Sequence, residues 1–206
     1  MVTKLKSRVA VQKCVGFDRN APGGTTTTWL TPKTLVDVLG PFDLDPCVPP
    51  QMPWRTATRM LTVKEDGLAT PWPRSAFVFH NPPYGKGQVA WMQKAAEHGN
   101  GVTLVLARFD TRWMHDWVLN HPATTALVFV KGRVQFCRPD GSPGPSSPAP
   151  SIFIGYGKKA SKRLERAVRS GAISGAFFAV DRLALVARNH SVAANDECYR
   201  LPLGAG

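Results

Sequence analysis

The chain has 206 residues, 43% of them hydrophobic, and carries a formal net charge of +12 with a pI near 10.0. This length and hydrophobic content suit one α/β domain with appendages and exclude disorder throughout, while the charge favours a polyanionic partner over the alternative of a basic protein without one. The four cysteines are scattered, which excludes a zinc site and a disulfide framework and leads us to expect a protein of a reducing cytoplasm. The chain has no run of about 20 apolar residues and no apolar core at its N-terminus, which excludes a membrane span and an export signal.

The N-terminal part predicts an arm, a short helix and a short strand. Residues 1–28 are basic and then small and polar, and we expect them to form a flexible arm. A helical pattern follows, with Thr31 as its N-cap and Pro32 at its first position. Residues 42–45 predict a strand that ends at Pro46, where a proline-rich loop begins.

The middle of the chain alternates apolar runs with helical patterns. Helices are predicted at residues 88–98, with Val89, Met92 and Ala96 facing inward, and at residues 111–119. Apolar runs predict strands at residues 76–80, 102–107, 126–130, 133–136 and 151–156. Residues 138–150 are rich in Pro, Gly and Ser and predict an exposed loop. This alternation predicts an α/β fold with a mostly parallel sheet, helices on both of its faces and an antiparallel hairpin at one edge.

The C-terminal part, residues 158–206, predicts a basic helix and an extension packed on the same domain. The apolar side of the helical pattern at residues 159–170 consists of Ala160, Leu164, Ala167 and Val168. The basic side consists of Lys159, Lys162, Arg163, Arg166 and Arg169. Beyond Gly171 no period is decisive, and no element is assigned there.

The tetrapeptide Asn81-Pro82-Pro83-Tyr84 follows directly on a predicted buried strand, at the sheet edge where α/β proteins bind ligands. An aromatic amine is a poor nucleophile because its lone pair is delocalised into the ring. Two acceptors out of the ring plane, the Asn81 side-chain oxygen and the Pro82 carbonyl, would favour its tetrahedral, reactive geometry, and the prolines pre-position them. Tyr84 offers a face on which a base could stack, which contributes about 1–3 kcal/mol. The alternative is a proline-terminated strand with a packed tyrosine.

This tetrapeptide resembles the signature of the amino-methyltransferases, Asn/Asp/Ser-Pro-Pro-Tyr/Phe/Trp. Together with six other segments in order, it more closely resembles the small phage and prophage DNA N6-adenine methyltransferases. The resemblance runs from about residue 29 to residue 156. Its other segments are Trp29-x-Thr31-Pro32, Phe42-Asp43-Leu44-Asp45-Pro46-Cys47, Asp66-Gly67-Leu68 with Trp72, Ala107-Arg108-Phe109-Asp110-Thr111-Arg112-Trp113, Lys131-Gly132-Arg133-Val134-Gln135-Phe136 and the strand at Ser151. It implies a Rossmann-like methyltransferase domain at residues 29–157 that uses S-adenosylmethionine and acts on DNA in the cytoplasm of a bacterial host.

The resemblance also implies cofactor-binding residues. Thr31 and Pro32 would cover the methionine end of S-adenosylmethionine, and Asp45, next to Pro46, would meet its ammonium group. Asp66 would accept from the amine of the cofactor's own adenine, and Asn81 would border the same site. The alternatives are a helix cap for Thr31 and turn-forming roles for both aspartates.

The sequence departs from the family pattern at the cofactor site. A glycine-rich loop is expected after the first strand, but Cys47-Val48-Pro49-Pro50 stands there. No acid that would hold the ribose hydroxyls follows the short second strand near residues 60–62. These departures support a further hypothesis, that of a non-catalytic nucleic-acid-binding module with this fold.

An adenine in a duplex must be extruded before its amine can be methylated, and basic residues that bind phosphates offset part of that cost. The candidates for DNA contacts are Lys86, Arg108, Arg112, Lys159, Lys162, Arg163 and Arg166. The alternatives are a salt-bridged helix start for the two arginines after residue 107 and a solvated surface for the basic helix. Another acceptor (cytosine N4, an RNA base or a protein glutamine) stays open, as does the oligomeric state.

Overall fold

A computed structural model describes residues 28–85 and 87–181. Nearly all of the predicted N-terminal arm and most of the expected C-terminal extension lie outside the described residues. Within the described ranges, no helix is long and apolar enough to cross a membrane.

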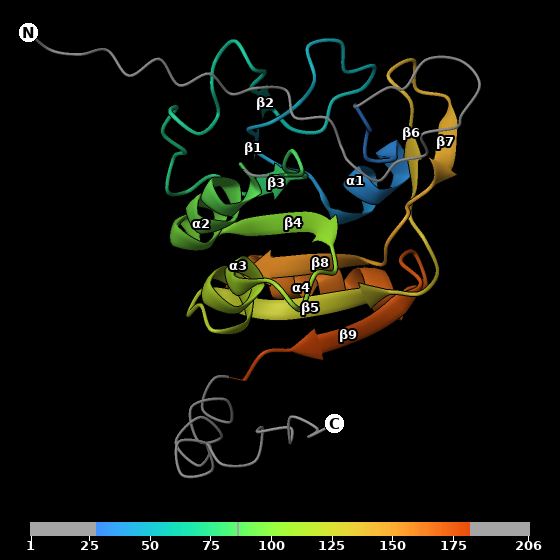
Figure 1. Ribbon diagram of the computed structural model, residues 1–206. Helices are drawn as coiled ribbons and strands as arrows, with labels where there is room; N and C mark the ends of the chain where they lie inside the picture. Colours follow the sequence, from blue (N-terminus) through green and yellow to red (C-terminus); the bar gives the residue numbers. More distant parts are fainter. Residues whose placement is uncertain (1–27, 86, 182–206) are drawn as a thin grey trace, which may run out of the picture.

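A seven-stranded sheet forms the centre of the molecule, in the order β2-β1-β3-β4-β8-β5-β9 (Figure 1). Its strands are β1 (Leu44–Asp45), β2 (Arg59–Met60), β3 (Val78–His80), β4 (Gly101–Leu106), β5 (Thr124–Val130), β8 (Ser151–Tyr156) and β9 (Gly175–Ala179). The pairs β1–β2, β1–β3 and β3–β4 are parallel. Strand β8 runs antiparallel to both of its neighbours, β4 and β5, and β9 runs antiparallel to β5. Five of the seven strands therefore point the same way, and the predicted mostly parallel sheet is confirmed.

Helices cover both faces of the sheet, as predicted. Helices α1 (Lys33–Leu39) and α4 (Gly157–Arg169) pack on one face, and α2 (Gln88–His98) and α3 (Arg112–Met114), which continues as the π-helical turn η1 (His115–Leu119), pack on the other (Figure 1). Because successive strand residues point to opposite faces, Phe79 of β3 joins the first core and Val78 the second. Burial on both faces explains why these strands are continuous apolar runs in the sequence.

Three local predictions about these elements are wrong. Thr31 is not an N-cap, because α1 begins at Lys33 after Pro32 and no side chain caps it. Val89 is 44% exposed instead of facing inward, although Met92 and Ala96 are buried as predicted. The expected antiparallel hairpin does not form the edge of the described sheet. Strand β8 lies in the interior between β4 and β5, and β9 pairs with β5 as the edge strand.

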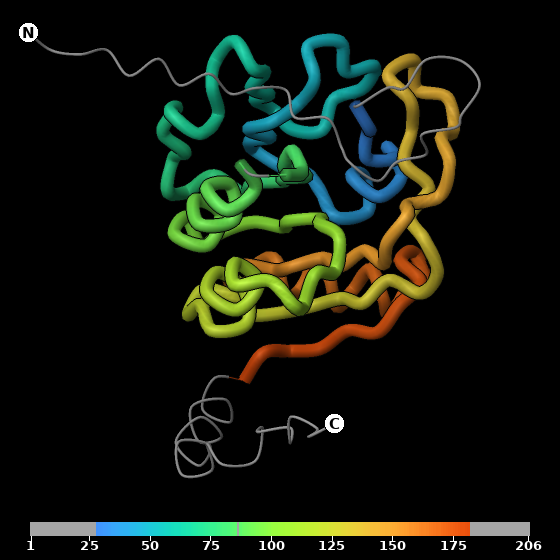
Figure 2. The backbone as a smooth tube through the Cα atoms, viewed as in Figure 1, coloured from blue at the N-terminus to red at the C-terminus, as the bar shows by residue number. Residues whose placement is uncertain are grey.

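The region predicted as a loop at residues 138–150 contains a strand. Strand β7 (Pro143–Ser146) pairs with β6 (Gln135–Cys137) in a separate two-stranded sheet. Leu30 adds a bridge to Cys137, and Figure 2 shows the hairpin beside the start of α1. Gly144 explains the close packing, since a Cβ there would lie 2.5 Å from the ring of Trp29.

Candidate active site

The sheet has a switch point at β1, which has β2 on one side and β3 on the other. Connections leave the carboxyl ends of these strands in opposite directions, which opens a crevice where α/β proteins bind ligands. Asp45 is the last residue of β1, and His80 is the last residue of β3, with Asn81 next in the chain. The fold therefore brings together two of the predicted site residues, Asp45 and Asn81.

The Asn81 side chain is held at both ends. Its Nδ2 donates a hydrogen bond to Thr31 Oγ1 at 3.1 Å, and the Tyr84 hydroxyl donates to its Oδ1 at 3.4 Å. Pro82 is buried and Pro83 is exposed. Since a carbonyl oxygen has two lone pairs, Oδ1 can accept a further hydrogen bond from a substrate amine.

The Asp45 carboxylate is buried, with a residue exposure of 3%. Its Oδ2 accepts from Thr56 Oγ1 at 2.6 Å, and its Oδ1 accepts from the backbone N–H of Cys47 at 3.2 Å. Burial raises the pKa of Asp45 to about 6, and these hydrogen bonds oppose the shift. The bond to Cys47 closes a turn, as the turn-forming alternative expects, but the burial leaves a carboxylate that a cation would stabilise.

Thr31, Asp45 and Asn81 line one small cavity of about 30 Å³. Two further residues on its wall, Cys47 and Thr56, were missed from the sequence. The Cys47 thiol donates to the Asn81 carbonyl at 3.4 Å, and burial raises its pKa, so it stays neutral and links the loop after β1 to the loop after β3. In the sequence Cys47 ends one of the segments of the family resemblance and begins the departure from the glycine pattern, but neither signal assigns it a role, and nothing in the sequence signals Thr56.

Asp66, which the resemblance also assigns to the cofactor, does not line this cavity. It has a positive φ of 48°, and its Oδ1 accepts from the backbone N–H groups of Leu68 and Ala69. The neighbouring Gly67 packs on the loop after β1, because a Cβ there would lie 1.9 Å from the Pro46 carbonyl oxygen. The geometry of an Asp-Gly turn is therefore present, and its glycine packs against Pro46.

Lys94 of α2 fixes this turn from the other side. Its Nζ donates to the carbonyls of Gly67, Leu68 and Thr70 at 3.1, 2.6 and 2.7 Å and lies 5.2 Å from the centre of the Trp72 ring. The cation thus ties the turn to a helix that packs on the sheet.

We expect Lys94→Met to lower the free energy of unfolding by about 2 kcal/mol, because three carbonyl groups lose a charged donor. Urea denaturation measures this change, and Lys64→Met, at an exposed lysine of the same region, is the matched control. Equal effects of the two substitutions would contradict the assigned role of Lys94.

His80 lies directly beneath the tetrapeptide and is fully buried. Its Nδ1 pairs with Thr103 Oγ1 at 3.0 Å, and its ring packs against Trp72 and Trp91. Burial lowers the pKa of His80 to about 3, so the ring is neutral at pH 7. His80 therefore supports the end of β3 as a packed, uncharged side chain.

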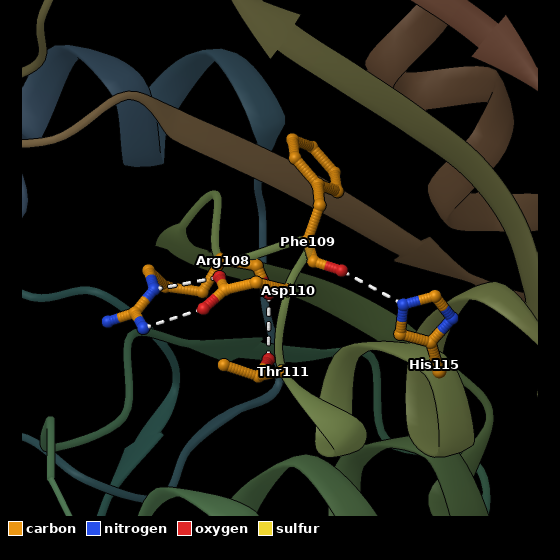
Figure 3. A network of polar contacts seen from close by, with 5 residues as sticks. All are labelled: Arg108, Phe109, Asp110, Thr111 and His115. Carbon is orange, nitrogen blue, oxygen red and sulfur yellow. Dashed lines mark hydrogen bonds and ion pairs between the residues drawn. The ribbon is translucent and has the colours of Figure 1, made fainter. Parts of the chain in front are cut away.

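The loop after β4 is braced internally (Figure 3). Arg108 forms a two-pronged ion pair with Asp110, at 3.0 and 2.9 Å, and the Thr111 hydroxyl donates to the Arg108 carbonyl. Arg112 pairs with Asp116 one turn along the helix, and its side chain is 94% exposed. The salt-bridged alternative is thus present in the structure for both arginines, and the Arg112 side chain is the more exposed of the two.

The predicted basic helix divides into two parts. The Lys159 ammonium and the Arg163 guanidinium lie over the Phe77 ring, at 4.4 and 5.3 Å from its centre, and Arg163 also donates to the Leu39 carbonyl at 3.0 Å. Phe77 precedes β3, at the end of that strand opposite Asn81. Lys162 and Arg166 are exposed. Lys159 is also exposed despite its contact with the ring, whereas Arg163 is partly buried, and Lys86 lies outside the described residues.

Over the described ranges, no group of three or more His, Cys, Asp or Glu residues could hold a metal ion. The open sheet and the polar side chains at its switch point define a class: α/β proteins that bind a ligand at the carboxyl edge of the sheet. The chain belongs to the DNA N-6-adenine-methyltransferase (Dam) family, whose sequence profile matches residues 19–156. No curated protein and no solved structure matches the chain significantly.

Proposed function

We propose that this protein transfers a methyl group from S-adenosylmethionine to the N6 amine of adenine in DNA, with Asn81-Pro82-Pro83-Tyr84 as the catalytic segment. The observation that carries the proposal is the convergence of Thr31, Asp45 and Asn81 on one cavity at the switch point of the sheet. Family membership supports the reaction class. In this proposal residues 29–157 form a Rossmann-like methyltransferase domain, and residues 158–206 extend it.

The residues at the cavity fit the charged amino-acid end of S-adenosylmethionine. Asp45 is a buried carboxylate that accepts two hydrogen bonds and can accept more, so a bound ammonium group would satisfy it. The cavity of about 30 Å³ is far smaller than the whole cofactor, so the remainder would lie in the open crevice towards Pro46 and Asp66. When bound, the cofactor supplies a methyl group activated by a positively charged sulfur.

The protein's own groups would act on the adenine amine. Asn81 Oδ1 and the Pro82 carbonyl accept its two N–H groups and direct its lone pair at the methyl carbon. Transfer would join the methyl group to the amine nitrogen and leave the sulfur as a neutral thioether, and the methylated amine would lose one proton to solvent. Tyr84 stacks on the extruded base.

Outward basic side chains would hold the DNA backbone. We expect the double substitution Lys162→Gln/Arg166→Gln to reduce the slope of log K against log [salt] by about 2, because about 0.9 counterions are released per neutralised phosphate. Fluorescence anisotropy over a salt series measures the slope. The matched control is Arg163→Gln. Because Arg163 packs on Phe77, this substitution should lower the free energy of unfolding and change the salt slope little. An unchanged slope in the double variant would remove these two residues from the DNA contact.

A methylation assay tests the proposed function. The purified chain is incubated with labelled S-adenosylmethionine and, in parallel, with DNA, RNA or a glutamine-containing protein, and the products are hydrolysed to nucleosides or amino acids. N6-methyladenine from DNA is the expected product. N4-methylcytosine, methylated RNA or methylglutamine would overturn the assigned acceptor. Failure to bind S-adenosylmethionine in calorimetry would favour a non-catalytic binding module. The proposed setting is the cytoplasm of a bacterial host that carries a phage or prophage.

A further inference from the structure

We propose that Thr31 is a positioning residue whose hydroxyl anchors the Asn81 amide beside the place of the substrate amine. The inference rests on the proposed function and adds to it a residue 50 positions away in the sequence. Its basis is the 3.1 Å hydrogen bond from Asn81 Nδ2 to Thr31 Oγ1, which occupies the nitrogen end of the amide.

The orientation of this amide decides whether Asn81 can act. Its oxygen and its NH₂ group are nearly equal in size, and a half-turn about the last side-chain bond exchanges them. The oxygen accepts a hydrogen bond from a substrate amine, whereas the NH₂ group would bring one N–H against another. Tyr84 approaches Oδ1 at 3.4 Å, at the outer limit of a hydrogen bond, and braces the amide only weakly. Both hydroxyls can donate or accept, so these contacts hold the amide in place, and the amine of the substrate completes the choice of orientation. The contact with Thr31 is the shorter of the two and therefore the stronger anchor.

Thr31 is well fixed for this role. It is 4% exposed, and on its N-terminal side Leu30 exchanges two backbone hydrogen bonds with Cys137, each of 2.9 Å. On its C-terminal side the Pro32 carbonyl accepts from Leu35 at 3.0 Å, in the first turn of α1. The β6–β7 hairpin and α1 thus hold the hydroxyl in place before the substrate binds. A group fixed in advance in this way lowers the barrier without being ordered during the reaction.

Two substitutions of Thr31 separate the hydroxyl from the methyl group. Thr31→Val keeps the shape and removes the hydroxyl, and Thr31→Ser keeps the hydroxyl and removes the methyl group. We expect Thr31→Val to lower kcat for DNA methylation by between about tenfold and a hundredfold, with little change in KM for DNA. We expect Thr31→Ser to keep most of the turnover. A packing role predicts the reverse order, with valine tolerated and serine impaired, and that result would overturn the proposal.

A calorimetric titration with S-adenosylmethionine completes the test, because Thr31 also lines the cavity assigned to the cofactor. The proposal expects Thr31→Val to bind the cofactor nearly as tightly as the wild-type chain. Weakened binding with an unchanged kcat would make Thr31 a cofactor contact instead and overturn the positioning role. Urea denaturation of each variant verifies that it is folded.

The outcomes also separate this inference from the proposed function. If the wild-type chain forms no N6-methyladenine, the proposed function fails. If it does form N6-methyladenine and Asn81→Ala does not, while Thr31→Val keeps its full kcat, only the positioning role of Thr31 is overturned.

Discussion

Replacing Asn81 with alanine is expected to lower kcat for N6-methyladenine formation by about 10²–10³, by analogy with the removal of one pre-positioned hydrogen-bonding group from other active sites. The substitution removes an acceptor that holds the substrate amine in its reactive geometry. The Asp45 carboxylate is untouched, so the cofactor should still bind. Nucleoside analysis under single-turnover conditions measures the chemical step, and calorimetry measures the affinity for S-adenosylmethionine.

Two further variants make this prediction specific. Asn81→Asp keeps oxygen acceptors at the same place and should retain much more activity than Asn81→Ala. Asn120→Ala removes an exposed asparagine at the end of the π-helical turn and should leave kcat unchanged. If Asn81→Ala were as active as Asn120→Ala, the tetrapeptide would be only a proline-terminated end of a strand.

The elements predicted best from the sequence are those with a local signal. The pattern at residues 88–98 gave the bounds of α2, because Gly99 adopts a left-handed conformation and ends the helix. The apolar run at residues 151–156 gave the bounds of β8, since that strand is buried on both faces. The apolar run at residues 76–80 likewise predicted a strand buried on both faces, which placed Asn81 at its end.

The features that were missed depend on contacts between distant segments. The prolines at residues 143 and 145 predict a loop, yet strand β7 forms there because Gly144 packs against Trp29. Strand β9 contains only Gly, Ala and Phe, and its sequence shows no clear alternation of apolar and polar residues. It forms a strand because it pairs with β5.

The site shows the same limit. Local patterns identified Thr31, Asp45 and Asn81 separately, but only the fold shows that Thr31 reaches the Asn81 amide. The helical period predicted Arg163 on the basic side of α4, away from the core. It could not show that Arg163 reaches across to Phe77 and the Leu39 carbonyl, which directs this charge inward.

Replacing Asp45 with asparagine is expected to stabilise the ligand-free protein at pH 7 by up to about 3 kcal/mol. Burial raises the pKa of Asp45 from 3.8 to about 6, and each pKa unit corresponds to about 1.4 kcal/mol. A carboxyl group whose pKa is raised by folding stabilises the folded state below pH 4, and this contribution is lost as the pH rises to about 6. Asparagine has no such loss, and its amide can hydrogen bond both Thr56 and Cys47.

The pH dependence of stability should change as well. The pKa of His80 is lowered from 6.5 to about 3, so its contribution is present above pH 6.5 and is lost as the pH falls. Between pH 4 and 6 the two groups oppose each other in the wild-type chain. In Asp45→Asn this opposition is removed, and His80 should make the free energy of unfolding fall by about 1.4 kcal/mol per unit of decreasing pH. His98, whose pKa is also lowered by burial, acts in the same direction. Urea denaturation at several pH values measures both slopes.

The same substitution should weaken binding of S-adenosylmethionine. The buried carboxylate would thus lower the stability of the ligand-free protein and raise its affinity for the cofactor. Loss of one partner from a buried charge pair costs about 2–5 kcal/mol, so the affinity should fall at least about thirtyfold. Wild-type affinity should decrease below about pH 6, where Asp45 is protonated, and the variant should lack this dependence. Asp37→Asn, at an exposed i,i+4 ion pair, is the control and should alter neither quantity appreciably. A less stable Asp45→Asn variant with unchanged cofactor affinity would reduce Asp45 to a turn-forming residue.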